Sequence, residues 1–539
     1  MQRSRRNPIG FIQTVWAFMS LFGRLLQRQM YLSHNAQPQQ IRHFVPGQLL
    51  LLGEHSDQLD KAAIIQALKN HSIIQCHQEL ADALQKPPRK LLSFHRNRQE
   101  SQQAASTTNQ NPSFSLIFID VPITEQDQLI DLIDKVNQDI LAATNQEGPL
   151  NLHIISPNWL ASTAGSIGVV GGPGTRPIPA PAMPPDWQQT PVDAPGAPFG
   201  FELNMPVIEP TSPPEQIEVA ILDTAPPGDN IKKAYNAWQS KHPLIKSLLG
   251  PDGTLGMNST LEIAYAPGPI LDRYAVSGHT YQMFDHGLFA AGIIHTLAPT
   301  VKLRLIEVLN HYGVGSIETA IDALQQLNMR EAGQPPLIVN CSLMLNIPLE
   351  GQPKPELDWP SLNEDSRLVK RMGNTVKWIT DLLRERNVLF VAAAGNDAEA
   401  GMERPQARYP AAFEDVVGVG ALHPDGVPAD YSNISDTPLS IGIATFGGKA
   451  SGDDSVPNEA VRGIYTGLFP NGEQNHDGWA WWSGTSFATP IISGVLAALC
   501  HQGASPQEAW EALSASVEDP SGPTMIGRVF QAQQNSLSS

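Results

Sequence analysis

The chain has 539 residues, 53 of them acidic and 35 basic, which gives a formal net charge of −18 at pH 7. This length predicts more than one domain, and the acidic balance argues against nucleic acid or an anionic membrane as the main partner of the whole chain. Cys76, Cys341 and Cys500 are too few and too widely spaced for a disulfide framework or a zinc site, so we expect buried, unreactive thiols.

Residues 1–45 form a basic and apolar segment. Three arginines precede an apolar run over residues 9–22, which is similar to the hydrophobic region of a signal peptide. Two more arginines follow, no small-residue cleavage site stands at the expected place, and the run is too short to span a bilayer. A basic amphipathic helix over residues 9–32, lying on a membrane surface or docked on a partner, fits equally well. We therefore expect an intracellular or membrane-associated location rather than export by a standard signal peptide.

Residues 46–160 predict the order strand, helix, strand, strand, helix, strand, which is typical of a small ferredoxin-like α+β domain. We expect strands at 48–52, from 73, at 114–119 and at 152–155, helices over 56–68 and 124–136, and a polar loop at about 96–112. An unrelated accessory or partner-binding domain is the alternative.

Residues 161–199 are dense in proline and glycine, which predicts an exposed, semi-extended linker that is easily cleaved. Its glycine-rich part is not a phosphate loop, because no Gly-Lys-Ser/Thr follows.

From about residue 200, four segments place polar side chains at the ends of apolar elements. Asp223 ends an apolar strand, and His286 begins an apolar helix pattern rich in small residues. Asn396 follows a second apolar strand, and Ser486 lies in Gly-Thr-Ser-Phe-Ala-Thr-Pro before an apolar helix. Each has an ordinary structural interpretation, as a turn, a cap or a structural histidine. A serine hydroxyl, however, needs a base, an orienting group and oxyanion donors, and their joint occurrence predicts serine catalysis.

These segments resemble the Asp-Thr/Ser-Gly, His-Gly-Thr-His, Ala-Gly-Asn and Gly-Thr-Ser-Met-Ala-Thr-Pro motifs of the subtilisin-like serine peptidases, the subtilase family. Further segments over 338–343, 409–413, 417–421 and 429–433 are similar to other parts of that family. The resemblance covers about residues 200 to 520, leaving 521–539 as a C-terminal tail. It implies a three-layer α/β domain with a central, mostly parallel sheet.

The resemblance implies a role for each motif residue. Ser486 is the nucleophile, His286 the base, Asp223 the group that orients it, and Asn396 with the Ser486 N–H the oxyanion hole. The implied substrate cleft is bordered by Ser342, Leu343, Met344, Ala393 and Gly395. A polypeptide is then the substrate, and the chemistry requires no cofactor. The implied N-terminal domain is a propeptide that inhibits the enzyme with its C-terminal tail, so that the enzyme is made as a zymogen.

Three departures from the family pattern have different consequences. Ala225 stands for a glycine, which a turn accepts if its φ is negative. Leu288 and Phe289 replace Thr and a second His, which alters local polar packing and not the base. Met344 stands for a glycine in the cleft strand and should crowd the pocket for the substrate residue before the cut.

Other classes are disfavoured or left open. The α/β-hydrolase motif Gly-x-Ser-x-Gly is absent, because Ala488 stands two residues after Ser486. A glutamate-based relative of the subtilases is disfavoured by the histidine segment. Structural calcium, using Asp229 or the Asp453–Asp454 pair, matches no loop motif and an exposed acidic turn is favoured. A catalytically silent peptidase-fold binding or scaffolding protein remains the alternative function.

Overall fold

The computed structural model describes residues 44–55, 77–94, 113–123, 126–147, 152–163, 175–182, 201–207, 216–250, 261–268, 270, 282–328, 335–345, 347, 380, 383, 387–398, 400–401, 403–435, 442–452, 454–517 and 526–534. The chain divides into two compact units. The first comprises Met1–Leu160, Ser316–Met329 and Ile347–Leu382, and the second comprises Ala161–Gly315, Arg330–Asn346 and Leu383–Ser539.

The first unit is built on an antiparallel sheet with the strand order β4-β1-β3-β2. Its elements are β1 (Phe44–His55), α4 (Gln78–Gln85), β2 (Lys90–Phe94), β3 (Ser113–Asp120), α5 (Gln126–Glu147) and β4 (Leu152–Thr163). Residues 56–76 lie outside the described part of the chain. They include the expected first helix, the start of the strand expected from 73, and Cys76. The split β-α-β arrangement agrees with the expected topology, but the ferredoxin-like assignment itself stays a prediction.

The second strand of this sheet differs from the expected one. It is β2, which follows Pro87 and Pro88 and pairs with β3 from Lys90 to Phe94. The helix before it, α4, buries Leu80, Ala81, Ala83 and Leu84 on one face. At eight residues it is short, so its apolar periodicity is easily missed in the sequence.

A helix from later in the chain completes the first unit. It is α9 (Ile317–Asn328), which contacts β2. Arg89 Nη2 lies 3.2 Å from Glu318 Oε2 and Lys90 Nζ 3.6 Å from Glu318 Oε1, and Lys90 also pairs with Asp322. Glu318 is buried, so both cations compensate a carboxylate that has left water.

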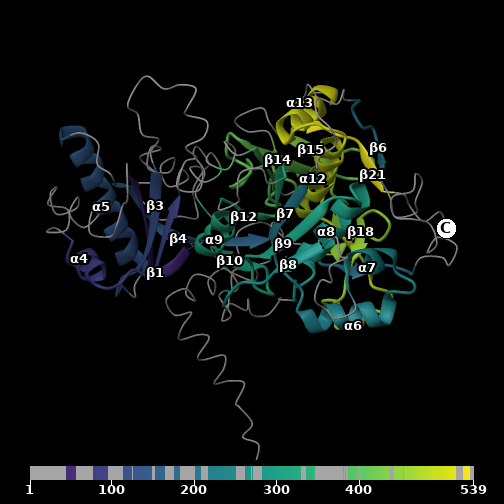
Figure 1. Ribbon diagram of the computed structural model, residues 1–539, viewed down its shortest axis with the longest axis horizontal. Helices are drawn as coiled ribbons and strands as arrows, with labels where there is room; N and C mark the ends of the chain where they lie inside the picture. The colour runs from purple at the N-terminus through teal and green to yellow at the C-terminus, as the bar shows by residue number, and fades with distance from the viewer. Residues whose placement is uncertain are drawn as a thin grey trace, which may run out of the picture. The chain divides into compact units, whose positions relative to one another are not determined.

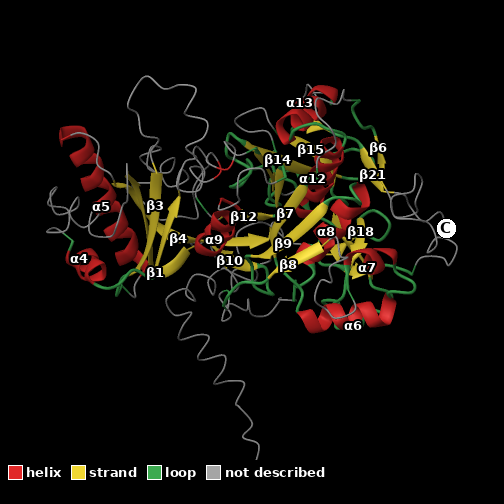
Figure 2. Cartoon of the chain, in the orientation of Figure 1, coloured by secondary structure: helices red, strands yellow, loops and turns green. Residues whose placement is uncertain are grey.

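The second unit is a three-layer α/β structure around eight parallel strands in the order β20-β15-β14-β13-β11-β7-β9-β8. These strands are β7 (Glu218–Asp223), β8 (Leu261–Ala264), β9 (Lys302–Glu307), β11 (Leu337–Cys341), β13 (Val388–Ala393), β14 (Val416–Leu422), β15 (Ile443–Phe446) and β20 (Arg528–Val529). The central strands are fully buried, as expected for a parallel sheet covered on both faces. Figure 2 shows the strands in yellow with red helices about them.

The described helices of the second unit are α6 (Gly228–Trp238), α7 (Pro243–Leu248), α8 (His286–Leu297), α12 (Thr485–His501) and α13 (Pro506–Ser516). Of these, α8, α12 and α13 contact the sheet, α7 packs on α8, and α6 contacts α7 at the periphery (Figure 1). The almost wholly apolar α12 packs beside α8 and against β11, β13, β14 and β15. The expected α/β fold with a central, mostly parallel sheet is thereby confirmed for the second unit.

Shorter strands complete the second unit and its edges. They are β5 (Ile178–Pro179), β6 (Phe201–Leu203), β10 (Val314–Ser316), β12 (Leu343–Leu345), β16 (Ala450–Ser451), β17 (Asp454–Ser455), β18 (Val461–Ile464), β19 (Trp479–Trp482) and β21 (Ala532–Gln534). In the described part of the chain, no single helix is long and apolar enough to cross a membrane, and α12 and α13 meet that criterion only as a pair bent by 116°. The expected membrane-surface helix over 9–32 lies outside the described residues.

Two segments differ from the sequence interpretation. The expected linker is not exposed over Ala161–Thr163, which is fully buried, and Thr175 and Ala180 are also buried because this stretch pairs with other strands. The tail assigned to 521–539 contains β20 and β21, which pair with β15 and β6. Proline-rich and short segments carry little periodicity, so partners elsewhere in the chain decide their conformation.

Candidate active site

A buried carboxylate and a buried imidazole meet at the carboxyl end of β7. Asp223 is the last residue of β7, and His286 is the first of α8. His286 Nδ1 lies 2.8 Å from Asp223 Oδ1 and 2.9 Å from Oδ2, and both side chains are almost fully buried. A carboxylate at Nδ1 favours the tautomer that keeps the other ring nitrogen, Nε2, as a proton acceptor.

Ser486 lies at the start of α12, where the chain approaches His286. The flanking rings show this proximity, because the His286 ring centroid is 5.2 Å from that of Phe487 and 5.3 Å from that of Trp482. The Ser486 hydroxyl donates to the Ser342 carbonyl oxygen at 3.3 Å. Reaching His286 therefore requires a change of the Ser486 rotamer, and such hydrogen bonds often tighten only when substrate binds.

Pro490 explains how the backbone of Ser486 is held. It lies in the second turn of α12 and, having no N–H, cannot donate to the Ser486 carbonyl oxygen. That oxygen instead accepts from Ser342 Oγ at 2.8 Å. Asn340 Nδ2 donates to Ser342 Oγ at 3.0 Å, and Ser493 Oγ donates to Asn340 Oδ1 at 2.9 Å. A buried chain of polar side chains thus fixes the backbone at Ser486.

Asn396 follows β13 and is oriented by the residue before the serine. Its Oδ1 accepts from Thr485 N at 3.0 Å and from Thr485 Oγ1 at 2.9 Å. These two donors determine which end of the amide carries the oxygen, so the other end presents the NH₂ group. Among the described residues, Ser486 N–H has no hydrogen-bond acceptor. Unpaired N–H groups at the start of a helix can bind an anion.

The first two departures from the family pattern lie near Asp223 and His286. Ala225 is buried and is not among the described residues with positive φ, so the turn accepts it as expected. Phe289 is buried, with its ring centroid 4.7 Å from Phe487 and 5.7 Å from Trp482. An aromatic cluster therefore replaces polar packing behind His286.

The cleft strand already pairs with another part of the chain. In an antiparallel register, Leu343, Met344 and Leu345 of β12 lie opposite Thr163, Ser162 and Ala161, the end of β4. Thr163 N also donates to Gly313 O at 3.0 Å. An extended segment is therefore held beside Ser342, the residue that contacts Ser486.

The space beside this strand is narrowed by Met344. Its side chain is fully buried against Ala393, across the expected cleft. Gly395 has φ +110°, and a Cβ there would lie 2.7 Å from Asn433 Nδ2, so no larger residue fits without movement. The space between β12 and β13, where the cleft is expected, is thus closely packed at Met344 and Ala393.

Behind Gly395 lies an ion pair that the sequence interpretation did not identify. Arg408 Nε and Nη2 donate to Asp397 Oδ2 and Oδ1 at 2.8 and 3.0 Å, and Asn433 Nδ2 donates to Oδ2 at 2.7 Å. Burial alone would raise the pKa of Asp397, but the charge of Arg408 and these hydrogen bonds lower it. Since Asp397 directly follows Asn396, the pair supports the candidate oxyanion donor.

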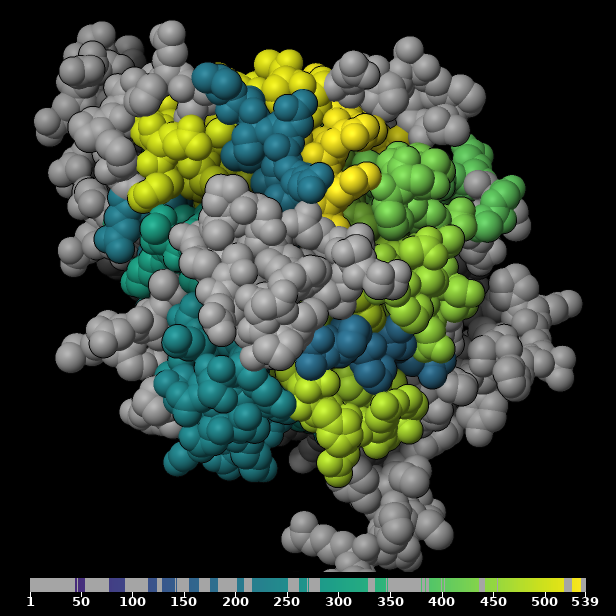
Figure 3. Space-filling view, turned by 90° about the vertical axis from the view of Figure 1, so that its right-hand side faces the viewer, coloured from purple at the N-terminus to yellow at the C-terminus, as the bar shows by residue number. Residues whose placement is uncertain are grey.

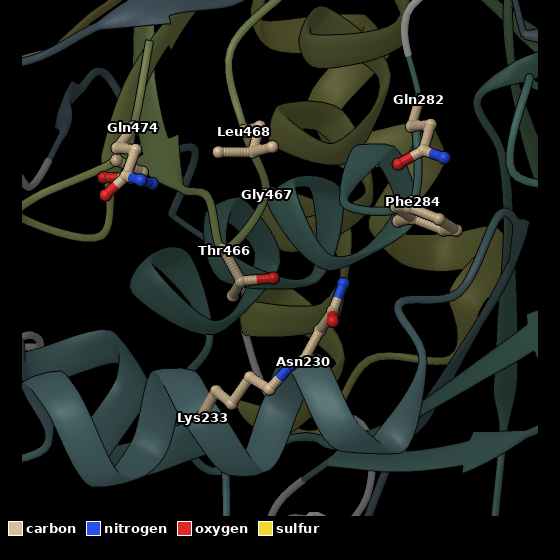
Figure 4. Close-up of a pocket in the computed structure, with 9 residues that line it drawn as sticks. Asn230, Lys233, Gln282, Phe284, Thr466, Gly467, Leu468 and Gln474 are labelled. Carbon is tan, nitrogen blue, oxygen red and sulfur yellow. The ribbon is translucent and has the colours of Figure 1, made fainter. Parts of the chain in front are cut away.

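A polar pocket borders the segment that carries His286. Its volume is about 540 Å³, and its lining includes Lys233 of α6, Phe284 and Thr466 (Figure 4). Thr466 N and Oγ1 and Gly467 N donate to the buried Asp285, each at 2.7 Å. Burial raises the pKa of Asp285 against the effect of these donors. The donors anchor the start of α8.

The described residues contain no group of three or more His, Cys, Asp or Glu side chains that could hold a metal ion. Asp229 lies in the first turn of α6, Asp454 pairs with Arg176 at 3.7 Å, and Asp453 lies outside the described part. Burial raises the pKa of the Cys341 and Cys500 thiols to about 12, which makes both poor nucleophiles.

Comparisons with known proteins match parts of this chain to peptidases. The model of the subtilase family of peptidases, Peptidase_S8, matches residues 254–525, which is 272 of 539 residues. The chain is 25% identical over 221 residues to an intracellular serine protease of Paenibacillus polymyxa, covering 39% of this chain and 52% of that protein. It is 37% identical over 107 residues to halolysin of Haloferax mediterranei, covering 20% of this chain and 15% of that protein. The chain thus spans about half or less of these relatives.

Solved structures that are similar to part of this chain include two proteases. The patellamide maturation protease PatA is 24% identical with a TM-score of 0.36, covering 59% of this chain and 94% of that one. A cold-adapted subtilisin-like serine proteinase is 17% identical with a TM-score of 0.35, covering 67% of this chain and 100% of that one.

Proposed function

Because the chain belongs to the subtilase family, we propose that it is a serine endopeptidase with Ser486 as nucleophile, His286 as base and Asp223 as orienting carboxylate. The observation that carries the proposal is the buried Asp223–His286 pair. The His286 ring packs against Trp482 and Phe487, which precede and follow Ser486 in the chain. The substrate is a polypeptide, and this chemistry requires no cofactor.

The reaction begins when the Ser486 hydroxyl turns from Ser342 O to His286. Oγ attacks the peptide carbonyl carbon while His286 Nε2 takes the hydroxyl proton and then delivers it to the leaving amine. Asp223 keeps Nδ1 protonated and stabilises the imidazolium. Water then attacks the acyl-enzyme, and the same imidazole takes a proton from the water and returns it to Ser486.

The oxyanion of each tetrahedral intermediate accepts from Asn396 Nδ2 and Ser486 N–H. The orientation of the Asn396 amide by Thr485 supports this role, because a preorganised donor needs no reorganisation during the reaction. Met344 and Ala393 leave little space for the substrate residue before the cut, which favours small side chains there.

The chain is made as a zymogen in this proposal. Ala161–Thr163 pairs antiparallel with β12, as an extended substrate would on the side before the cut. The residues that follow, 164–174, then contain the bond that is cut. This is a narrower site for maturation cleavage than the whole linker, 161–199, that the sequence predicts. Before this cut the N-terminal part is an intramolecular inhibitor, and after it the ion pairs to α9 keep the fragment bound.

Covalent labelling tests the catalytic assignment. A fluorophosphonate or sulfonyl fluoride probe should label Ser486 of wild-type protein once the N-terminal part has been released. It should not label the Ser486→Ala variant, and Ser514→Ala, in α13, is the control. Absence of labelling in released wild type, beside a labelled active peptidase, favours the silent peptidase-fold alternative.

Terminal sequencing tests the zymogen assignment. Wild-type protein should acquire a new N-terminus within residues 165–175, and Ser486→Ala should stay intact. Wild-type protein that cleaves added peptides while its own chain remains whole contradicts self-processing but leaves the catalytic assignment standing.

A further inference from the structure

The stretch Thr175–Pro181, called the strap below, pairs with β19, the strand that directly precedes α12 and Ser486. Ile178 and Pro179 lie opposite Trp481 and Ala480 of β19 in an antiparallel register, and Ala180 N donates to Trp479 O at 3.4 Å. The strap therefore forms the third strand of a sheet with β18 and β19. In the space-filling view it shows as a dark blue strip bordered by yellow-green atoms (Figure 3).

Side-chain contacts fasten both ends of the strap. At its start, Thr175 Oγ1 donates to Ser483 O, and Trp482 Nε1 donates to Thr175 O at 2.8 Å. At its end, the Arg462 guanidinium donates to Pro181 O. Arg462 is buried and lies 4.6 Å from the Trp479 ring centroid, so its charge is held in place by a cation–π contact.

One side chain joins the strap to the active site. Trp482 donates to the backbone of Thr175, and its ring packs edge-on against His286 with centroids 5.3 Å apart. Ser483, the acceptor of the Thr175 hydroxyl, is three residues before Ser486. The strap thus begins beside the segment that joins β19 to Ser486.

The chain direction agrees with this position. Residues before the proposed cut, Ala161–Thr163, run antiparallel to β12 beside Ser342. Residues after it, Ile178–Pro179, run antiparallel to β19. A substrate that followed the same route would occupy the β12 edge with its residues before the cut and the β19 edge with its residues after it.

We propose, on the basis of the proposed function, that the strap stays paired with β19 after the chain is cut and occupies the site for substrate residues that follow the scissile bond. The strap remains covalently attached to the peptidase unit, so its effective concentration is high and a substrate must displace it. The mature enzyme then discriminates against polypeptides that extend far beyond the cut, while substrates that end just after it bind unhindered.

Hydrogen exchange tests persistence of the strap without using the enzyme's own activity. A recognition sequence for a site-specific protease replaces part of 164–174 in the Ser486→Ala background, and the full chain is cut by that added protease. The amides of Ile178 and Ala180 should keep their protection to within about threefold after cutting. Loss of protection to the level of an unstructured peptide overturns the proposal.

Kinetics test occupancy of the substrate site. The double variant Thr175→Val/Ala180→Pro removes two donors of the strap, and Thr300→Val, on an exposed turn, is the matched control. Two substrates share the residues before the cut; one ends in an aryl amide and the other continues for six residues. The double variant should raise the ratio of kcat/KM for the long over the short substrate about five- to tenfold, and Thr300→Val should not change it.

The outcomes are distinguishable. An unchanged ratio in the double variant, with the protection of the Ile178 amide lost, overturns the proposed occupancy. Failure of wild type to hydrolyse even the aryl amide contradicts the proposed peptidase function, while hydrogen exchange still decides whether the strap persists.

Discussion

Asp223 and His286 are joined by a buried hydrogen bond in which both carboxylate oxygens lie within 2.9 Å of Nδ1. The two residues come from β7 and α8, which are in contact at the carboxyl end of the parallel sheet. This is the edge at which open α/β sheets place their functional groups. The pair therefore owes its geometry to the topology of the second unit.

Asp223→Asn should lower kcat about 10⁴-fold with little change in KM, because an amide NH₂ facing Nδ1 stabilises the wrong tautomer. Steady-state kinetics on a peptide substrate measure this effect. Asp229→Asn, an exposed carboxylate in the first turn of α6, is the control and should retain wild-type kcat. Comparable losses in both variants would contradict the assigned role of Asp223.

Asn396→Ala should lower kcat about 100- to 1,000-fold, because one oxyanion donor is lost. Thr485→Val removes only the hydroxyl that orients Asn396 Oδ1 and leaves the Thr485 N–H in place, so we expect a loss of about tenfold or less. Single-turnover kinetics separate the chemical step from product release. An equal effect of the two variants would indicate that Asn396 acts on structure rather than on the oxyanion.

The four motif residues were predictable because each follows or begins a strongly apolar element, and strands and helices of that kind form as their periodicity indicates. Asp397 and Arg408 were not, because their pairing depends on how the chain returns after residue 397. Likewise, no local pattern indicates that Thr175 would meet Ser483 or that Ala161–Thr163 would meet β12. The composition of the proline-rich stretch lacks core residues and so predicts exposure, although pairing with a strand edge requires only backbone groups and a few side chains.

Asp397 should make stability depend on acid pH. Its pKa is lowered by Arg408 in the folded state, so its stabilising contribution is complete above the unfolded pKa of about 4 and is lost as pH falls through the lower folded value. Thermal unfolding should therefore show a steeper fall in Tm below pH about 4 in wild type than in Asp397→Asn. At pH 7 the variant should be less stable by up to about 3–5 kcal/mol, because Arg408 loses its charged partner. Parallel pH curves for the two proteins would contradict this linkage.

The ion pairs of Glu318 should control how long the N-terminal part stays bound after the cut. Replacing both Arg89 and Lys90 by Met leaves the buried Glu318 carboxylate without its cations, which should speed release of the N-terminal fragment about tenfold or more. Size-exclusion chromatography of the cut protein, with time, measures release. Lys135→Met, at an exposed position of α5, is the control. Release that is equally slow in all three proteins would show that apolar contacts, not these charges, hold the fragment.

Met344 should limit the size of the substrate side chain before the cut. Its buried side chain packs on Ala393 between the two cleft strands, where the family pattern has glycine. Met344→Gly should therefore raise kcat/KM for substrates with Phe or Leu before the cut about 10-fold or more, relative to substrates with Ala. The same change opens a cavity, and a loss of about 2–5 kcal/mol in stability is expected for a buried large-to-small replacement. Met344→Ala should give an intermediate preference, so the series separates pocket size from general damage. A uniform fall for all substrates, with no change in their order, would mean that Met344 supports β12 without shaping the pocket.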